Sequence, residues 1–229
     1  AIASGADALL FIPFDKDGAA PIIDNCNEAG IPVICCNNIT TNVDQATAYV
    51  GANDVEAGIM ETEYIVDLIG GKGNIAVVEG PFGHSAQVAR QEGLEQVLAG
   101  YPDCKIVLDD TANWNRDEAM ELVENWIAGG TQIDAIICHN DIMAMGALQA
   151  CQDAGLEIPI IGIDATYDAL CAVKDGTLAA DVYQDVYGQA EEAFNVCMRI
   201  LNGETFEQTT YVPFKLITKD NVDEYLANF

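Results

Sequence analysis

Short apolar segments alternate with amphipathic segments along nearly the whole chain, and this alternation limits the available folds more than any other feature. The apolar segments predict strands at 8–12, 32–36, 74–78, 105–108, 134–138, 159–163, 178–183 and 210–217. Several are continuous runs of Val, Ile, Leu and Cys, which is typical of parallel strands covered on both faces. The segments between them predict helices at 18–29, 54–69, 84–99, 115–128, 141–153, 165–173 and 185–202. Strand then helix, repeated, predicts an α/β fold with a parallel sheet and right-handed crossovers.

Charge and hydropathy argue against a nucleic-acid partner and against a membrane span. The 229 residues contain 37 Asp and Glu against 9 Lys and Arg, a formal net charge of −28. Because such a surface repels a phosphate backbone, the sequence argues against a nucleic-acid partner. No apolar run approaches the ~18 residues that a membrane span needs, so no span is predicted.

Signatures of metal sites and of enzymes are scarce. The eight cysteines form no CxxC pair, and several lie in apolar runs, where a reduced cysteine acts as a small hydrophobe. The segment 83–87 lacks the second glycine of a nucleophile elbow, and the glycines at 70–73 precede a strand and lack the spacing of a phosphate loop. The sequence therefore predicts no metal, no cofactor and no enzyme activity. The carboxylates of the helix 54–69 are interpreted as a solvated face: Asp54, Glu56, Glu61, Glu63 and Asp67.

Polar side chains follow most of the predicted strands, at the edge where open α/β sheets bind ligands. They are Asn37 and Asn38, Gln87 and Arg90, Asn113 and Trp114, His139 to Asp141, Asp164, and Gln184 with Asp185. Amide, carboxylate and guanidinium groups make paired hydrogen bonds with adjacent hydroxyls, and an aromatic face covers the C–H side of a sugar ring. With Asp164 as a counter-charge for Arg90, the set favours a neutral polyol over an anion.

Each of these residues also has a simpler structural interpretation. Asn140 and Asp164 are suited to capping the helices that follow them, and Trp114 could belong to a core. Arg90 alone would usually be a solvated helix residue, and His139 fits a structural position at a strand end. Their shared position at one sheet edge favours binding.

Four segments resemble one known family. They are 139–147 (HNDIMAMGA), 162–165 (GIDA), 110–114 (DTANW) and 83–90 (GHSAQVAR). Through them the chain resembles, over essentially its whole length, the monosaccharide-binding proteins of ABC importers of the ribose and glucose/galactose type. The resemblance implies the type I periplasmic binding protein fold, with two doubly wound parallel-sheet lobes joined by a three-crossing hinge.

The resemblance also assigns ligand-binding positions: Asn37, His84, Arg90, Trp114, Asn140, Asp164 and Gln184. Asn37 would contact the sugar from the first lobe, Trp114 would stack on the ring, and the others would bind hydroxyls or the ring oxygen. Asn37 and Asn38 replace the Asp-Arg of the ribose type, and Ala86 stands where the glucose/galactose type has an acid. The calcium loop of the latter type, which would fall near 70–74, is missing. The chain therefore departs from both the ribose and the glucose/galactose pattern, and the sequence leaves the ligand open among hexoses, pentoses, inositol and furanosyl sugars.

The same resemblance predicts the lobes. The first comprises 1–53 and 185–212, and the second comprises 54–184 and 213–229. Residues 1–7 match the last turn of a helix rather than a signal peptide, with Gly5 just past its end. We therefore expect the first lobe to lack about one strand–helix–strand–helix portion, including a strand end that would supply half of an aromatic clamp.

The expected function is a solute-binding protein that captures a monosaccharide or polyol and presents it to an ABC permease. It would be extracytoplasmic, either periplasmic or lipid-anchored at the cell surface. One alternative is the effector-binding core of a sugar-responsive repressor of the same fold, although the charge of −28 suits proximity to DNA poorly. A third hypothesis is an α/β enzyme, and no nucleophile–base pair in the sequence supports it.

Overall fold

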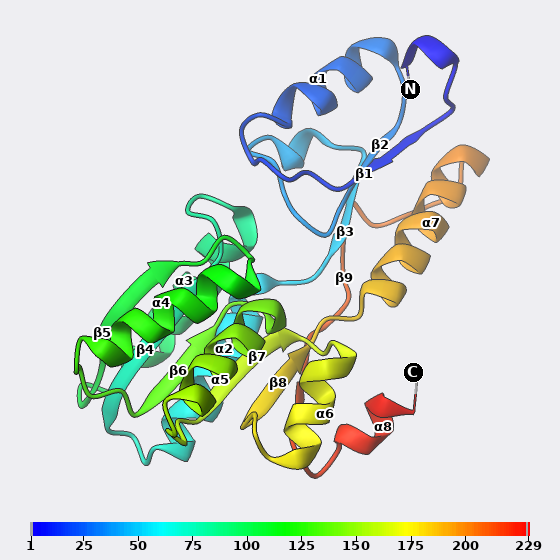
Figure 1. Cartoon of the computed structure of the whole chain (residues 1–229). Helices are drawn as coiled ribbons and strands as arrows, with labels where there is room; N and C mark the ends of the chain where they lie inside the picture. Colours follow the sequence, from blue (N-terminus) through cyan, green and yellow to red (C-terminus); the bar gives the residue numbers. More distant parts are fainter. Residues whose placement is uncertain (1, 228) are drawn as a thin grey trace. The chain divides into compact units, whose positions relative to one another are not determined.

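The computed structural model describes residues 2–227 and 229, and its chain divides into two compact units (Figure 1). Unit 1 contains residues up to Asn53, Gly83–Ala86 and Asp185–Pro213, and unit 2 contains Asp54–Phe82, Gln87–Gln184 and Phe214–Phe229. Compared with the expected lobes, unit 1 gains Gly83–Ala86 and Pro213. That the first lobe is incomplete stays a prediction.

Unit 1 is a four-stranded parallel sheet in the order β1-β2-β3-β9. Its strands are β1 (Leu9–Phe11), β2 (Val33–Cys36), β3 (Ala48–Gly51) and β9 (Thr209–Tyr211), and its helices are α1 (Ala20–Ala29) and α7 (Val186–Asn202). Short 3-10 turns lie at Ile2–Ser4 and Val43–Gln45.

Alternate residues of β2 face different helices of unit 1. Val33 and Cys35 pack with Ile23 of α1, whereas Ile34 packs with Ala193 of α7. Because both faces of the sheet are covered, β2 carries an unbroken apolar run, as the sequence predicted.

Unit 2 is a six-stranded sheet in the order β10-β8-β7-β6-β4-β5, in which only β10 is antiparallel to its neighbour. Its strands are β4 (Gly73–Glu79), β5 (Cys104–Thr111), β6 (Ala135–Cys138), β7 (Ile160–Asp164), β8 (Ala180–Tyr183) and β10 (Lys215–Ile217). Its helices are α2 (Asp54–Leu68), α3 (Ser85–Leu98), α4 (Arg116–Ala128), α5 (Asp141–Asp153), α6 (Tyr167–Asp175) and α8 (Val222–Leu226), with the first residues of α3 counted in unit 1.

The structure corrects two strand predictions. The sequence did not predict β3, whose Ala-Tyr-Val-Gly has no long apolar run but pairs in parallel register with β2. The single strand expected at 210–217 is two strands, because Thr209–Tyr211 completes the sheet of unit 1 and Lys215–Ile217 lies at the edge of the sheet in unit 2.

One core of unit 2 lies between its sheet and the helices α4, α5 and α6. Alternate strand residues such as Val78, Ile136 and Ile160 pack there with Met143 and Leu170. All eight cysteines are free thiols and most are buried, which fits their interpretation as small hydrophobes.

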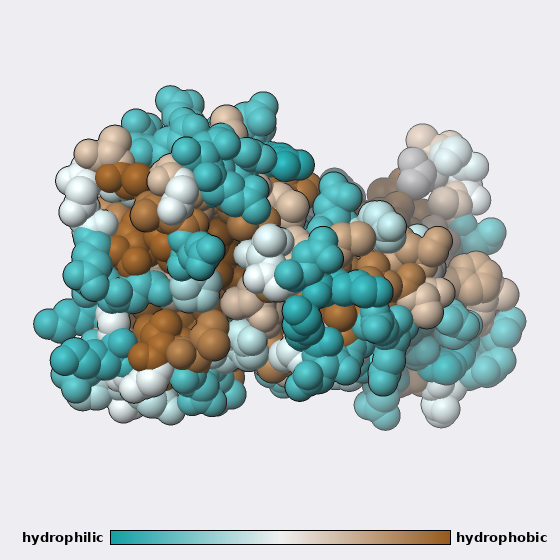
Figure 2. All heavy atoms as spheres, turned by 60° about the horizontal axis from the view of Figure 1, so that its bottom comes forward, coloured by the Kyte–Doolittle hydropathy of each residue, from teal (hydrophilic) through white to brown (hydrophobic). Residues whose placement is uncertain are grey.

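Hydrophilic residues dominate much of the face drawn in Figure 2, with hydrophobic residues in separate groups between them. Within the described part of the chain, no helix combines the length and the hydropathy needed to cross a membrane.

Candidate functional site

The carboxyl ends of the parallel strands in unit 2 carry most of the predicted site residues. Trp114 follows β5, Asn140 follows β6, Asp164 ends β7 and Gln184 follows β8, while Arg90 comes from α3. Asp164 lies in register with Tyr183, the residue before Gln184. Because these ends share one edge of the sheet, unit 2 gathers the predicted residues on that edge.

Backbone strain is concentrated next to the same strand ends. Among the described residues, the non-glycine positions with left-handed φ are Asn37 (60°), Asn113 (53°), Trp114 (59°), Asp164 (132°) and Ala165 (60°). Asn37 follows β2 of unit 1, and the other four follow or end β5 and β7 of unit 2. Such conformations cost about 1–3 kcal/mol each and cluster at functional sites, so the strain supports a ligand-binding role for this edge.

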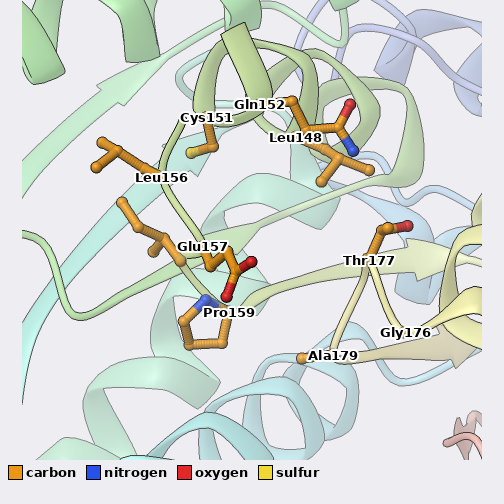
Figure 3. Close-up of a pocket in the computed structure, with 10 residues that line it drawn as sticks. Leu148, Cys151, Gln152, Leu156, Glu157, Pro159, Gly176, Thr177 and Ala179 are labelled. Atoms are coloured by element: carbon orange, nitrogen blue, oxygen red, sulfur yellow. The ribbon is translucent and has the colours of Figure 1, made fainter. Parts of the chain in front are cut away.

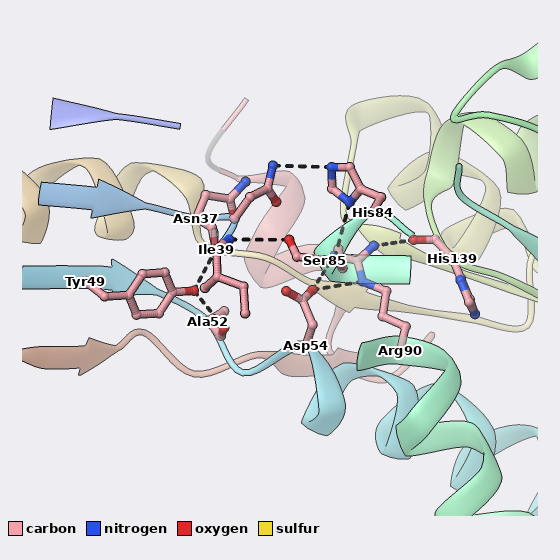
Figure 4. A network of polar contacts seen from close by, with 11 residues as sticks. Asn37, Ile39, Tyr49, Ala52, Asp54, His84, Ser85, Arg90 and His139 are labelled. Atoms are coloured by element: carbon pink, nitrogen blue, oxygen red, sulfur yellow. Dashed lines mark hydrogen bonds and ion pairs between the residues drawn. The ribbon is translucent and has the colours of Figure 1, made fainter. Parts of the chain in front are cut away.

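Arg90 is held by several polar contacts (Figure 4). It is only 4% exposed, its Nε lies 3.0 Å and its Nη2 2.9 Å from Asp54 Oδ1, and its Nη1 donates to the carbonyl of His139. Its guanidinium carbon lies 5.8 Å from the ring centroid of Trp114. Burial acts to lower the pKa of Arg90, but the charges of Asp54 and Asp164 outweigh it and raise this pKa.

The interpretation of the acids on 54–69 as a solvated face is wrong for two of them. Asp54 is the direct partner of Arg90, a role that the sequence gave to Asp164. Glu61 is fully buried and neither of its carboxyl oxygens has a hydrogen-bond partner in the structure. Burial raises the pKa of Glu61 well above its ordinary value. A helical pattern of acids does not reveal which face a neighbouring helix covers.

Two glycines bring Asp54 and Arg90 together. A Cβ on Gly58 of α2 would lie 2.0 Å from the carbonyl oxygen of Arg90, and one on Gly93 of α3 would lie 2.2 Å from that of Val55. The backbones of α2 and α3 therefore meet without intervening side chains, which places the start of α2 beside Arg90.

Trp114 lies against the strand end of β4. A Cβ on Gly80 would lie 2.1 Å from Cζ2 of the indole, and the ring also packs at the margin of the core of unit 2. Trp114 is half-buried rather than enclosed. Its stacking on a sugar ring stays a prediction.

Asn140 and Asp164 differ in how they fit the helix-capping interpretation. Asn140 Oδ1 accepts a hydrogen bond of 3.0 Å from Met143 N, so Asn140 caps α5 through its oxygen. This cap does not use the amide nitrogen of Asn140. The N-cap of α6 is Thr166 and not Asp164. Burial raises the pKa of Asp164 to about 6, against the opposing effect of Arg90.

Unit 1 holds the other two predicted site residues, Asn37 and His84 (Figure 4). The carbonyl of Asn37 accepts a 2.6 Å hydrogen bond from the hydroxyl of Tyr49, which fixes its left-handed backbone. His84 Nδ1 accepts from Ala86 N at 3.2 Å, and its Nε2 lies 3.4 Å from Asn38 Nδ2. By its contacts His84 therefore belongs to unit 1, whereas the sequence placed it in the second lobe.

The sequence assigned no role to Glu79, at the end of β4. Glu79 is 3% exposed, and Gln87 Nε2 donates to its Oε2. Burial and the neighbouring Asp109 raise the pKa of Glu79 to about 8. The sequence feature that could have identified Glu79 is an acid in the last position of a buried strand.

His139 fits its structural interpretation. Its side chain is fully buried with neither ring nitrogen hydrogen-bonded, and burial lowers its pKa to about 3. A neutral imidazole of this kind supports the site through its backbone carbonyl, which accepts from Arg90.

A hollow of about 500 Å³ lies in unit 2 at the opposite edge of the sheet (Figure 3). Leu156 to Pro159, before β7, and Gly176, Thr177 and Ala179, before β8, line it together with residues of α5. It contains none of the predicted site residues. Among the residues that the structure describes, no group of three or more His, Cys, Asp or Glu side chains is placed to hold a metal ion.

Parallel α/β units with strained residues at their strand ends are typical of ligand-binding proteins of the α/β class. Residues 1–205 match the family model described as "Periplasmic binding protein domain", and the chain belongs to this family. The predicted fold is confirmed.

Two curated relatives are binding proteins. The chain is 39% identical over 224 residues to the xylitol-binding protein of Mycolicibacterium smegmatis, covering 97% of this chain and 64% of that protein. It is 37% identical over 233 residues to a putative rhizopine-binding protein of Rhizobium meliloti, covering 98% of this chain and 75% of the relative. The chain thus spans less than two thirds of the length of the xylitol-binding relative.

A solved structure agrees closely with the fold. It is an ABC transporter solute binding protein from Bacillus halodurans with bound myo-inositol, with a TM-score of 0.96 and 40% identity. The match covers 100% of this chain and 80% of that chain.

Proposed function

We propose that this protein is the solute-binding component of an ABC importer and that it captures a neutral polyol, with myo-inositol and xylitol as the first ligands to test. Membership of the family supports this proposal, as do the relatives whose names give xylitol or whose structure holds myo-inositol. The protein would act outside the cytoplasm, in the periplasm or anchored to the membrane by a lipid.

The pairing of Arg90 with Asp54 is the observation that favours a neutral ligand over an anionic one. The guanidinium is buried and already balanced by a carboxylate within unit 2, and Asp164 adds a further acid near it. An anionic ligand would have to compete with these carboxylates for Arg90. Hydroxyl groups bring no charge and can both donate to carboxylates and accept from guanidinium and amide groups.

The proposed roles follow from the chemistry of each side chain. Trp114 would cover the C–H face of the ligand, while Arg90, Asn140, Asp164 and Gln184 would pair with its hydroxyls. Asn37 and His84 would contribute from the first lobe. Closure of the two lobes on the ligand would exclude water and create the form that an ABC permease recognises. The relatives give no support to the repressor alternative.

Isothermal titration calorimetry and thermal unfolding with myo-inositol, xylitol, ribose and glucose test the proposal. A ligand at 100 times its Kd stabilises the folded state by about 2.7 kcal/mol, so a specific polyol should raise the Tm clearly. We expect myo-inositol or xylitol to bind more tightly than ribose or glucose. If none of these compounds binds or raises the Tm, the proposal is wrong.

Trp114 and Trp126 offer a matched pair of variants. Both are half-buried and pack against the same core, but only Trp114 lies at the strand-end edge. Trp114→Leu should weaken polyol binding at least about tenfold, whereas Trp126→Leu should leave the Kd within about threefold. Equal losses of affinity would contradict the placement of the ligand at this edge.

A further inference from the structure

Two aspartates lie in the core of unit 2 directly behind the turn that presents Asp164. Asp141 is the first residue of α5, and Asp181 lies within β8 in register with Gly162 of β7. Both are fully buried. An acid in the middle of a buried strand conflicts with the local sequence pattern, and such conflicts are expected at functional or strained positions.

Each aspartate holds one backbone amide of the strained turn. Asp181 Oδ1 accepts a hydrogen bond of 3.3 Å from Ala165 N, and Asp141 Oδ2 accepts one of 2.7 Å from Thr166 N. These amides follow Asp164, and both Asp164 and Ala165 have left-handed φ values. The two carboxyl groups therefore anchor the backbone that aims the Asp164 side chain.

The second carboxyl oxygen of each aspartate does not bind the turn. Asp141 Oδ1 and Asp181 Oδ2 are buried and accept from no N–H or O–H donor in the structure. A Cβ on Gly162 would lie 2.5 Å from Asp141 Oδ1, so the missing side chain leaves room for this carboxyl beside β7 and β8. Because Asp181 lies in register with Gly162, its carboxyl group shares this space with that of Asp141, and two carboxyl groups in contact need one shared proton between them.

Acids outnumber cations among the titratable groups around the pair. The titratable and charged groups around the pair are Asp164 of β7, Arg90 of α3, Asp54 and Glu61 of α2, Cys138 and His139 at the end of β6, and Arg116 and Asp168, which line a hollow with Asp141. Arg90 is engaged by Asp54 and by the carbonyl of His139. Burial raises the pKa of Asp141 well above its ordinary value, and the charge of Asp181 adds to this rise. Burial also raises the pKa of Asp181, to about 7, although its hydrogen bond with Asp141 opposes the rise.

We propose that Asp141 and Asp181 form a proton-sharing pair that positions Asp164 for the ligand, so that ligand affinity falls when the pair loses its shared proton. In the singly protonated state the two acids attract each other and hold the amides of Ala165 and Thr166. When both are ionised, they repel each other in a medium of low dielectric, and the turn loosens. The effect on affinity rests on the proposed polyol-binding function, whereas the effect on the turn does not.

Asp181→Asn is the decisive variant. The new amide can donate to Asp141 Oδ1 in place of the shared proton, while its oxygen still accepts from Ala165 N. At pH 7 its Kd for myo-inositol or xylitol, whichever binds the wild type, should lie within about threefold of the wild-type value. Between pH 7 and pH 9 the wild type should lose at least about tenfold in affinity, and Asp181→Asn should lose little. An alkaline loss of equal size in both proteins would overturn the proposal.

Glu79→Gln is the control, because Glu79 also titrates above neutral pH near the same edge. It should keep the alkaline loss of affinity. If the loss disappears in Glu79→Gln and persists in Asp181→Asn, Glu79 and not the pair is responsible.

Hydrogen exchange of the ligand-free wild type tests the pair without a ligand. After correction for the intrinsic rate, protection of the amides of Ala165 and Thr166 should fall between pH 7 and pH 9, and protection of Met143 N, held by Asn140, should not. Constant protection of Ala165 and Thr166 would overturn the proposal even if Asp181→Asn fails to fold. Failure of every polyol and sugar to bind would instead refute the proposed function and leave this exchange test in force.

Discussion

Arg90 directs two guanidinium nitrogens, Nε and Nη2, at one carboxylate oxygen, Asp54 Oδ1, at 3.0 and 2.9 Å. The side chains involved are 5% and 11% exposed, so this ion pair is largely shielded from water. Breaking a shielded pair of this kind strongly destabilises the fold, because removing one partner leaves the other charge buried and unpaired. Arg90 therefore organises the strand-end edge before any ligand is present.

Arg90→Ala should strongly destabilise the protein. The substitution removes the partner of Asp54 and the donor to the His139 carbonyl, and breaking a buried pair costs about 3–5 kcal/mol. Urea unfolding at pH 7 measures the loss. Arg199→Ala is the matched control, because Arg199 pairs with Glu192 at 3.1 Å but its side chain is 42% exposed. That variant should lose no more than about 1 kcal/mol, and similar losses in both variants would contradict the assignment.

Gly80→Ala should disturb Trp114. The added Cβ would lie 2.1 Å from the indole, so the ring or the backbone must move, at a cost of about 1–3 kcal/mol. Polyol affinity should fall with it, and Trp fluorescence should change. Gly100→Ala is the control, since its Cβ would meet only the carbonyl of Val97 at 3.4 Å. If Gly80→Ala behaves like Gly100→Ala in both stability and affinity, the close packing of Trp114 on Gly80 is refuted.

Asp164 should make ligand affinity fall at acid pH, which gives the plot of affinity against pH an acid limb. Burial raises the pKa of Asp164 to about 6, and a ligand hydroxyl that donates to this group favours its ionised form. Affinity should therefore fall by about tenfold between pH 7 and pH 5. Asp164→Asn should bind more weakly at pH 7, by about 1.5–3 kcal/mol for a lost charged hydrogen bond, and should show no such limb. Calorimetry across this range is the measurement, and a variant with an unchanged acid limb would exclude Asp164 as its source.

The same raised pKa also affects folding. The folded Asp164 keeps its proton up to about pH 6, whereas the unfolded residue loses it near its ordinary value of 3.8. The folded state therefore binds more protons in this window, and the contribution of Asp164 to the free energy of unfolding falls as pH rises through it. Denaturant unfolding should show this contribution in the wild type and not in Asp164→Asn.

Glu61→Met should stabilise the protein. Glu61 is fully buried with neither carboxyl oxygen hydrogen-bonded, and an apolar side chain of similar size removes a penalty of about 1–3 kcal/mol. Because burial raises the pKa of Glu61, the wild type loses stability as pH rises above 4.5, so the gain of the variant should be larger at pH 8 than at pH 5.

The exposed Glu63 on the same helix provides the comparison. Glu63→Met should change the free energy of unfolding by no more than about 0.5 kcal/mol at either pH. If Glu61→Met is no more stable than the wild type at pH 8, the assignment of Glu61 as an unpaired buried acid is wrong.

The sequence predicted most strands of the two sheets because an unbroken apolar run is a local property. Ile75 to Val78 and Ile136 to Cys138 are covered on both faces, and their composition alone indicates this. It did not predict β3, since Ala48–Gly51 is too short an apolar run to stand out, and the structure shows it as a strand by its pairing with β2 and β9. The split of 210–217 between two sheets was equally invisible, because both halves have strand composition.

The sequence by itself determined the alternation of strand and helix, and with it the edge at which Trp114, Asn140, Asp164 and Gln184 emerge. Periodicity and the shared direction of parallel strands suffice for that. Only the tertiary structure decided which acids are buried and what they pair with: Asp54 meets Arg90 36 residues further along the chain, and Asp181 holds the amide of Ala165 across a strand pair. A carboxylate at a helix start looks the same in the sequence whether water or a second helix covers it. Its charge state depends on burial and on distant neighbours, and only folding brings these together.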